Sequence, residues 1–262
     1  MCYHHAVRAL TIKIVLNWNG KMDSSITAAL TFGFVWGLQH ALDPDHLVAV
    51  STIVSENKSV RRSSLVGTFW GLGHTASLLA VSVVILVLRA SIPERVALWM
   101  EIPVALMLIA LGVTTILRAT REGGWRIHTH THAHDETESP HTHVHVHTQA
   151  GHIHQHRLFR LGRRPFIVGM VHGIAGSAAL TLLVLTTIPS VVLGMVFIAV
   201  FGIGSIGGML LMSAVIGLPF ALTARRLSLI NGRIRIIAGL FSIFFGLMLA
   251  WNLLREIWKV SS

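Results

Sequence analysis

The sequence predicts an all-α, polytopic membrane protein with six transmembrane helices in two inverted three-helix repeats. Three observations lead to this fold class: a shortage of charge, a series of long charge-free runs, and a short motif that recurs in both halves of the chain. Of the 262 residues, 53% are hydrophobic and 12% are charged, whereas charged residues make up roughly 25% of an ordinary soluble domain. So few charged side chains cannot cover the surface of a soluble protein. We therefore expect the chain to lie in a lipid bilayer.

The charge-free runs place the six spans, because a helix needs about 20 mostly apolar residues to cross a bilayer. The first run is interrupted by two aspartates, and the fourth is long enough for two spans joined by a turn at residues 186–190. Short alternating segments typical of a membrane barrel are absent from the sequence. The apolar runs are residues 24–42 with 46–55, 63–88, 102–117, 165–224 and 236–254.

The chain divides into four parts. Residues 1–23 are expected to form an N-terminal interfacial segment, because cations interrupt their apolar run and a small-residue cleavage site is lacking. Two three-span halves, residues 24–118 and 165–262, flank a polar loop at residues 119–164. The single cysteine, Cys2, excludes an intrachain disulfide and multi-cysteine metal sites.

The distribution of Lys and Arg predicts the topology. With six spans, both termini lie on one side, and the loops after the first, third and fifth spans share the other. These three loops hold 14 of the 21 Lys and Arg residues, so their side is expected to be the cytoplasm. A membrane-inserted N-terminal segment would instead place the N-terminus inside. The excess of cations behind the net charge of +10 therefore sets the orientation of the protein in a cytoplasmic (inner) membrane. No nucleic-acid partner is needed to explain it.

The polar loop, on the predicted cytoplasmic side, carries a histidine tract. Its alternate spacing would place the rings on one face of an extended chain or leave them free in disorder. Neutral imidazole suits nickel, copper, zinc and cobalt, so we expect an accessory metal site that binds ions loosely; the alternative is a linker without a metal role. The tract holds 11 of the 17 histidines, namely His128, His130, His132, His134, His141, His143, His145, His147, His152, His154 and His156.

The start of the chain offers a weaker metal-site hypothesis. Cys2-Tyr3-His4, with a free amine after removal of Met1, has the donors of a square-planar copper or nickel site. A chance pair of histidines explains this segment more simply.

The sharpest signal is the stretch Gly-Leu-Gln-His-Ala-Leu-Asp-Pro-Asp-His, which ends at His46 in the first span. Each carboxylate costs roughly 2.5–3.5 kcal/mol at a helix centre, so the two aspartates are expected to have a function. Proline removes a backbone donor and disfavours helix at the residue before it, which predicts a first helix broken at Asp43-Pro44-Asp45. The break lets His40, Asp45 and His46 converge, whereas about 100° per residue in an unbroken helix would separate them. The alternative is a turn at the bilayer edge with solvated aspartates.

Two further histidines lie inside apolar spans. His74 follows Trp-Gly-Leu-Gly, and His172 precedes Gly-Ile-Ala-Gly-Ser. Small residues of this kind allow helices to approach closely. A lone histidine in a span is often hydrogen-bonded to a neighbour, but the closeness of the first motif in a small bundle favours a ligand role for both.

The two halves also resemble each other. Gly37-x-x-His40 aligns with Gly169-x-x-His172, and Gly-Leu-Gly-His74 aligns with Gly-Ile-Gly-Ser in the fifth span. An odd number of spans per half forces opposite orientations, and in such inverted repeats the binding site lies near the midplane where the halves meet. The second half lacks the carboxylates, so the ligand set would be asymmetric.

These motifs resemble the nickel/cobalt permease family. Its signature His-x-x-x-x-Asp-His is present as His40, Asp45 and His46. Residues 70–75 and 172–180 are also similar to the six-span, urease-associated nickel permeases of that family.

The resemblance implies a secondary permease that moves Ni²⁺, with Co²⁺ as a second candidate substrate. It implies that the ion is cargo, that there is no prosthetic group or enzymatic activity, and that cytoplasmic nickel chaperones are candidate partners. No Walker motif is present, so energy would come from an ion gradient, the membrane potential or a partner. The expected metal site consists of His40, Asp45 and His46 as first-choice ligands, with Asp43, His74 and His172 either binding the ion or contacting its ligands.

Several alternatives remain at the level of sequence. The span motifs favour uptake, but the histidine tract is similar to that of related nickel/cobalt exporters and favours efflux. A zinc exporter of the cation-diffusion type would pair Asp and His four residues apart on straight helices, and the contiguous pair here disfavours it. A membrane metal sensor that transports nothing stays open. An intramembrane metalloprotease would need His-Glu-x-x-His, which the sequence lacks.

Overall fold

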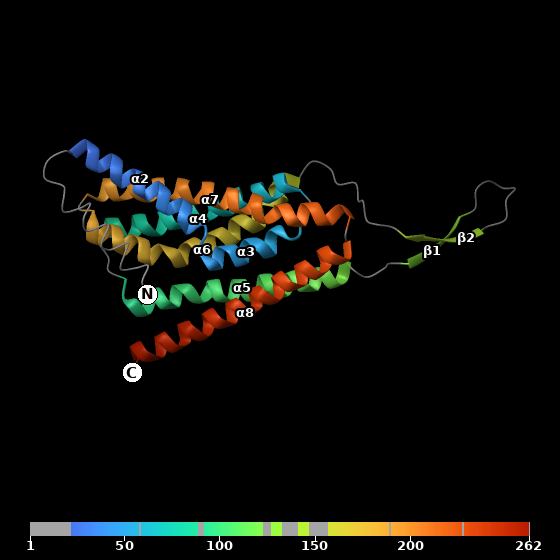
Figure 1. The fold of residues 1–262 in the computed structure, drawn as a ribbon. Coiled ribbons are helices and arrows are strands. Elements are labelled where there is room, and N and C mark those ends of the chain that lie inside the picture. The colour runs from blue at the N-terminus through green and yellow to red at the C-terminus, as the bar shows by residue number, and fades with distance from the viewer. Residues whose placement is uncertain are drawn as a thin grey trace.

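Seven helices and one pair of strands make up the described part of the computed structural model, which covers residues 22–57, 59–88, 92–122, 127–132, 141–146, 157–188, 190–226 and 228–261. In chain order they are α2 (Met22–His40), α3 (Pro44–Val54), α4 (Val60–Leu88), α5 (Glu94–Glu122), β1 (Ile127–His132), β2 (His141–Val146), α6 (Arg157–Thr187), α7 (Val191–Arg226) and α8 (Ser228–Ser261) (Figure 1). The predicted interfacial segment, apart from its last two residues in α2, lies outside the described residues, and so does Cys2-Tyr3-His4.

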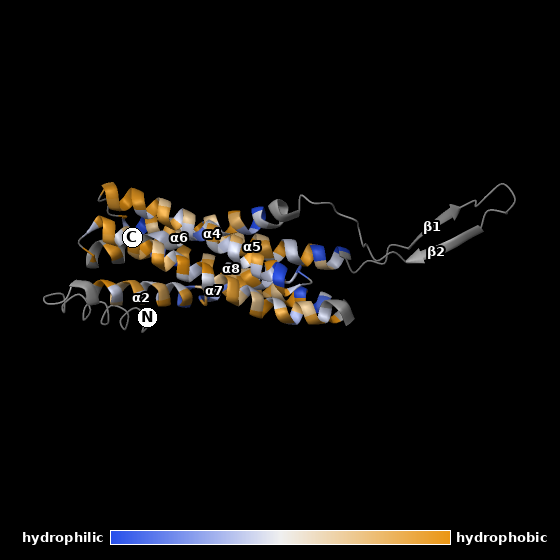
Figure 2. Cartoon of the chain, turned by 90° about the horizontal axis from the view of Figure 1, so that it is seen from above, coloured by the Kyte–Doolittle hydropathy of each residue, from blue (hydrophilic) through white to orange (hydrophobic). Residues whose placement is uncertain are grey.

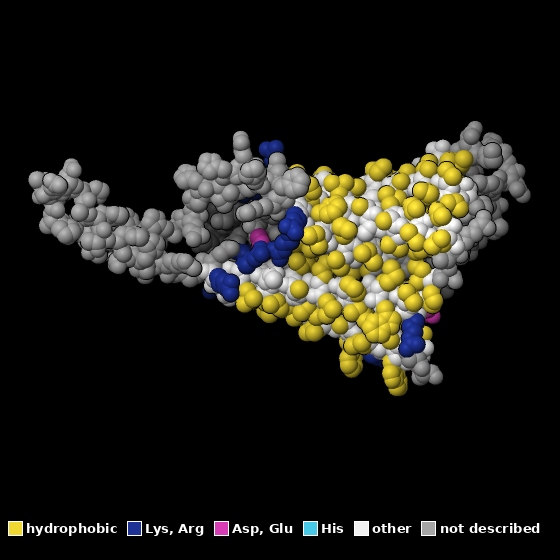
Figure 3. Space-filling model, turned by 180° about the vertical axis from the view of Figure 1, so that it is seen from behind, with side chains coloured by type: hydrophobic (Ala, Val, Ile, Leu, Met, Phe, Trp, Pro, Cys, Tyr) yellow, Lys and Arg dark blue, Asp and Glu magenta, His cyan; other side chains and the backbone are white. Residues whose placement is uncertain are grey.

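Four of the described helices are long and apolar enough to cross a membrane. Each has at least 28 residues in its apolar part, more than the roughly 20 that a bilayer requires. Figure 2 shows apolar residues along the helices and hydrophilic residues gathered toward the hairpin end. Figure 3 shows a face covered by apolar side chains, with Lys and Arg toward its ends. The prediction of a helical, multi-span membrane protein is therefore confirmed; the four spans are Val60–Leu88, Glu94–Arg121, Val191–Thr223 and Ile230–Val260.

The helices form a bundle with a second, flanking pair. Helices α2, α4, α6 and α7 pack together, while α5 packs chiefly against α8 (Figure 1). The short helix α3 contacts α4 and α7 on one side and α5 and α8 on the other. It therefore joins the bundle to the flanking pair.

Glycines bring α2 and α7 into backbone contact. A Cβ atom on Gly37 of α2 would lie 2.0 Å from the carbonyl oxygen of Phe201, and one on Gly204 of α7 would lie 2.2 Å from the carbonyl oxygen of Phe34. A side chain at either position would overlap the neighbouring backbone. Small residues that allow such approach are a main means of packing helices in membranes, where water does not drive helices together.

The contact between α4 and α6 has the same form. A Cβ atom on Gly169 of α6 would lie 2.1 Å from the carbonyl oxygen of Trp70, and one on Gly73 of α4 would lie 2.1 Å from the carbonyl oxygen of Phe166. The two helix pairs thus interlock through the same arrangement of glycines and aromatic residues.

The contact between the flanking helices α5 and α8 is also reciprocal. A Cβ atom on Gly112 of α5 would lie 2.5 Å from the carbonyl oxygen of Gly239, and one on Gly246 of α8 would lie 2.9 Å from the carbonyl oxygen of Ala105. Each helix therefore offers a glycine to the backbone of the other.

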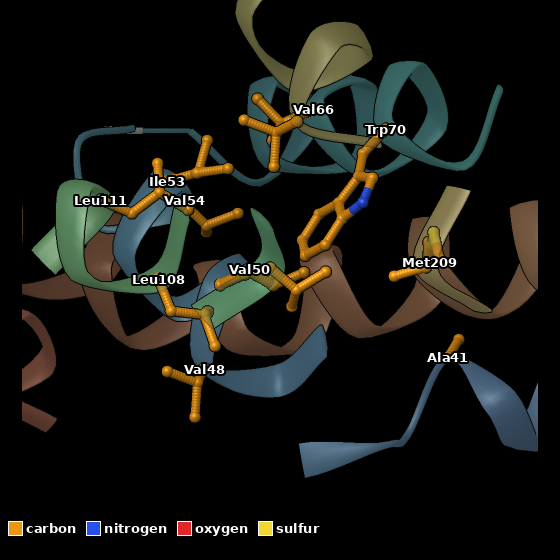
Figure 4. Close-up of a cluster of buried hydrophobic side chains, with 14 of the residues drawn as sticks. Ala41, Val48, Val50, Ile53, Val54, Val66, Trp70, Leu108, Leu111 and Met209 are labelled. Carbon is orange, nitrogen blue, oxygen red and sulfur yellow. The ribbon is translucent and has the colours of Figure 1, made fainter. Parts of the chain in front are cut away.

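A cluster of buried apolar side chains surrounds α3. Val48 and Val50 of α3 lie with Leu108 of α5 and Trp70 of α4 (Figure 4). Trp70 and Leu108 have no exposed surface. This packing fixes α3 in the middle of the molecule, and with it the residues at its N-terminal end.

Apart from the helices, part of the predicted polar loop forms a small β-hairpin. Part of the histidine tract forms the antiparallel strands β1 and β2, in which His128, His130 and His132 pair with His145, His143 and His141. Threonine and valine alternate with these histidines, and β-branched residues favour strands. The alternating spacing therefore produces an extended ribbon.

Candidate metal centre

The predicted break in the first helix is present. Helix α2 ends at His40 and α3 begins at Pro44. In the turn between them, the Leu42 N–H donates to the Gln39 carbonyl (2.8 Å) and the Asp43 N–H donates to the His40 carbonyl (3.1 Å). Pro44 occupies the first position of α3, where its missing N–H costs nothing and its fixed φ suits the helix.

Asp45 bridges two helices from the first turn of α3. A carboxylate is favoured there because the first N–H groups of a helix lack intrahelical partners. Its Oδ1 accepts a hydrogen bond from the His46 backbone N–H (2.9 Å) and lies 3.1 Å from Nδ1 of the His46 ring. Its Oδ2 lies 2.9 Å from Nε2 of His172 on α6. Asp45 therefore orients two imidazole rings at once.

Four imidazole rings from four helices meet beside Asp45. The ring centroids of His40 and His46 are 4.7 Å apart, and that of His74 lies 5.3 and 5.4 Å from them. The His172 ring lies 4.0 Å from His46. His46, His74 and His172 are buried, with at most 3% of their surface exposed.

The ligand atoms form two overlapping sets. One ligand atom each from His40, His46 and His74 lie within 4.8 Å of one another, and so do those of Asp45, His46 and His172. His46 belongs to both sets. Either set could hold one transition-metal ion, since neutral imidazole and carboxylate are suitable ligands.

Several of these ring nitrogens have no hydrogen-bond partner among the described residues. They are Nε2 of His40, Nε2 of His46, both nitrogens of His74, and Nδ1 of His172. Buried polar atoms are nearly always hydrogen-bonded, so such a concentration of unpaired ring nitrogens indicates a ligand site. Three histidines of one set each keep a nitrogen available for an ion.

Asp43 lies at the edge of this cluster. Its Oδ2 is 2.8 Å from Nδ1 of His40, and its side chain is 50% exposed. A carboxylate on one ring nitrogen fixes the tautomer and leaves the other nitrogen free for a metal. The structure thus brings all six predicted residues together, with Asp43 positioned to act through His40.

Trp70 was not predicted as part of the site. Its indole stacks on the His46 ring at 5.7 Å with an interplanar angle of 13°, and lies 6.0 Å from the His172 ring. Trp70 and His74 are four residues apart on α4, so they share a helix face. That spacing is the signal in the sequence that could have found it.

The six accessory histidines that the structure describes lie apart from this cluster. They belong to the backbone of β1 and β2, which Figure 1 shows beyond the helix ends. The other five lie outside the described residues: His134, His147, His152, His154 and His156.

A comparison with known protein families identifies the family of this chain. A family model described as NicO, high-affinity nickel-transport protein, matches residues 26–250. The chain belongs to the NicO family. The matched region contains all six residues of the cluster. The resemblance to nickel permeases is therefore confirmed, and the protein is a nickel transporter of the membrane and not an enzyme.

Curated relatives agree with membership of the NicO family. The chain is 37% identical over 235 residues to the urease accessory protein UreH of Bacillus sp. (strain TB-90), which covers 87% of this chain and 92% of UreH. It is 34% identical over 77 residues to the high-affinity nickel transport protein of Cupriavidus necator, which covers 29% of this chain and 21% of that protein. It is also 28% identical over 185 residues to the chloroplast protein FOR GROWTH AND FERTILITY 2 of Arabidopsis thaliana, covering 69% and 44% of the two chains. No solved structure matches.

Proposed function

We propose that this NicO-family protein is a secondary permease that takes up Ni²⁺, and also Co²⁺, through the histidine cluster. The observation that carries the proposal is the convergence of His40, His46 and His74 with unpaired ring nitrogens within 4.8 Å of one another. An ion bound by these rings would exchange its water ligands for imidazole inside the protein. Mg²⁺ and Ca²⁺ prefer oxygen ligands, so such a set selects against them.

The two overlapping sets suggest how the ion moves. His46 is shared, so an ion held by His40, His46 and His74 can pass to Asp45, His46 and His172 without losing all its protein ligands. Asp45 supplies negative charge that offsets that of the cation in a low-dielectric surrounding. The passage involves rings from both halves of the chain, as alternating access between the halves requires.

The proposed architecture has six spans in two inverted repeats. Helix α2 with α3 forms the first, broken span, and α6 adds the span that corresponds to it in the second half. The reciprocal glycine contacts support this arrangement: Gly37 meets Phe201 as Gly169 meets Trp70, and each pair lies at aligned positions of the two halves. A twofold axis between the halves would produce this pattern.

The proposed orientation places the histidine hairpin in the cytoplasm of a cell with an inner membrane. The excess of Lys and Arg in the loops on that side supports it. There the hairpin histidines would hold ions at the inner mouth and pass them to cytoplasmic nickel chaperones. A gradient or the membrane potential would drive uptake.

Accumulation of radioactive nickel and cobalt in cells tests this proposal. The variants are wild type, His40→Ala, His46→Ala and a deletion of residues 128–156, each compared with empty vector at matched expression. We expect wild type to accumulate both ions, the two alanine variants to match empty vector, and the deletion to retain transport. Accumulation below empty vector in wild type would identify an exporter. Loss of transport in the deletion but not in His40→Ala would place the transport site in the loop.

A further inference from the structure

Glu101 lies on the inward face of α5. Buried residues follow it at i+4, i+7, i+11, i+14 and i+18, which is the spacing of one helical face. Leu108 of this series packs in the cluster around α3 (Figure 4), and Gly112 packs against α8. Glu101 is therefore turned toward the protein and not toward lipid. The series is Ala105, Leu108, Gly112, Thr115 and Ala119.

This carboxylate is exposed, although it lies on the inward face of α5. Helices α3 and α5 run in the same direction (Figure 1), and α3 begins only at Pro44, beside the metal-binding cluster. Leu108 packs beside Val48, four residues after Pro44, and Glu101 is seven residues before Leu108, which places it beyond the start of α3. Glu101 is exposed and interacts electrostatically with Asp45. A carboxylate inside an apolar helix is costly unless it faces water or an ion. Its position therefore indicates an aqueous approach to the cluster.

Exposure decreases from this side into the cluster. The side chains of Asp43, Asp45 and His40 are 50%, 31% and 21% exposed, whereas those of His46 and His74 are buried. An ion arriving from the Glu101 side would thus meet carboxylates first and buried imidazoles last.

The other end of α3 is tied to its neighbours. Glu56, just after α3, accepts hydrogen bonds from Arg118 of α5 and Arg164 of α6, and Arg164 also donates to Thr114 (3.1 Å). The two arginines and Glu56 leave this end with a net positive charge, which repels a divalent cation, in contrast to the acidic side.

We infer that Glu101 collects the hydrated divalent cation at the approach to the cluster and raises its local concentration beside Asp45. The inference rests on the proposed function, because it names a residue of the same transport path. An exposed carboxylate flanked by apolar helices attracts a cation by its charge before any ligand exchange occurs. Glu101 would thereby set the apparent affinity for nickel without being one of its imidazole ligands.

Initial rates of Ni²⁺ flux in proteoliposomes test the inference. The full-length variants are wild type, Glu101→Gln, Glu101→Asp and His46→Ala, at low and at physiological ionic strength. The matched control is Glu256→Gln, which removes an exposed carboxylate paired with Lys259 on α8. We expect Glu101→Gln to raise KM about tenfold at low salt with the maximal rate kept, and this difference to shrink as salt screens the charge. Glu101→Asp and Glu256→Gln should behave like wild type.

The outcomes separate this inference from the proposed function. If Glu101→Gln has the same KM and the same salt dependence as wild type, the role of Glu101 is overturned and the proposed function stands. A reduced maximal rate at unchanged KM would also overturn it, because that pattern indicates packing or gating. A wild-type protein without His46-dependent nickel flux would overturn the proposed function together with this inference.

Discussion

The chain is broken between the helices that carry His40 and His46, whereas α6, which carries His172, is continuous. Helix α2 ends at His40 and α3 begins at Pro44, but α6 runs unbroken from Arg157 to Thr187 through His172. Where the first half has Asp-Pro-Asp, the aligned stretch of α6 reads Ala175-Gly176-Ser177. The comparison teaches that similar packing in the two halves can support different chemistry.

The same contrast appears one span later. His74 of α4 aligns with Ser205 of α7, and both are completely buried. Both ring nitrogens of His74 lack a partner among the described residues, whereas Ser205 Oγ donates to the Gly37 carbonyl (3.2 Å). The ring nitrogens of His74 are available to an ion, whereas the hydroxyl of Ser205 links α7 to α2.

The largest expected effect breaks the packing that the halves share. Gly37→Val and Gly169→Val should each reduce the yield of folded protein severely, because their Cβ atoms would overlap backbone at 2.0 and 2.1 Å. Overpacking typically costs about 1–3 kcal/mol and occasionally more, and an overlap with backbone lies at the upper end. Gly232→Val is the matched control, since nothing lies within 4 Å of that position. Size-exclusion profiles in detergent measure the effect. A strong effect in one half only would contradict equivalent packing.

The next effect separates the chemistry of the halves. His74→Ala should lower nickel transport by more than about 100-fold, beyond the roughly 10–100-fold that loss of an outer partner of a metal ligand costs. Ser205→Ala should change transport less than about twofold, because it loses one hydrogen bond worth about 1 kcal/mol. Nickel uptake rates of the two variants at matched expression measure the difference. Equal losses would mean that His74 serves packing only.

A smaller effect distinguishes the members of the second set. Asp45→Asn removes the charge and the acceptor that orients His46 and His172, and should raise KM for nickel by about 10–100-fold. His172→Ala should raise KM less, by about tenfold, because His40, His46 and His74 still form a complete set. Titration of uptake rate against nickel measures both. A larger loss in His172→Ala than in His40→Ala would reverse the proposed order of the two sets.

The smallest effect concerns the proline itself. Pro44→Ala should cost less than about 1 kcal/mol of stability and keep transport within about threefold. The turn is also held by the hydrogen bonds from Leu42 and Asp43 to the end of α2. Thermal unfolding and uptake measure the two quantities. Loss of transport in a stably folded Pro44→Ala protein would show that proline alone holds the break.

The sequence predicted the break and the aspartates beside it because their causes are local, whereas His74 and His172 were predicted from their place in apolar spans of a small bundle close to this motif. A proline disfavours helix before it, and aspartates in an apolar run are costly without a function. Glu101 was missed because the charge-free run starts at Ile102, while α5 continues through the charge to Glu94. A charge ends an apolar run in the sequence, but a helix can carry that charge on its inner face.

Contacts between distant helices were only partly predictable. The aligned glycine and histidine motifs predicted a repeat, which stays a prediction, but not that Gly37 meets Phe201 or that Trp70 stacks on His46. Such pairs depend on how helices cross, which single-helix periodicity does not encode. The hairpin was missed as a folded element because strand pairing depends on register between β1 and β2.

Nickel binding to purified protein tests the central claim most directly. The protein would lack residues 128–156, so that the histidine tract contributes no binding, and calorimetric titration in detergent would be compared with the same protein carrying His46→Ala. Since His46 belongs to both ligand sets, we predict one Ni²⁺ per chain in the first protein and none of comparable affinity in the second. One Ni²⁺ per chain with unchanged affinity in the His46→Ala protein would contradict the account.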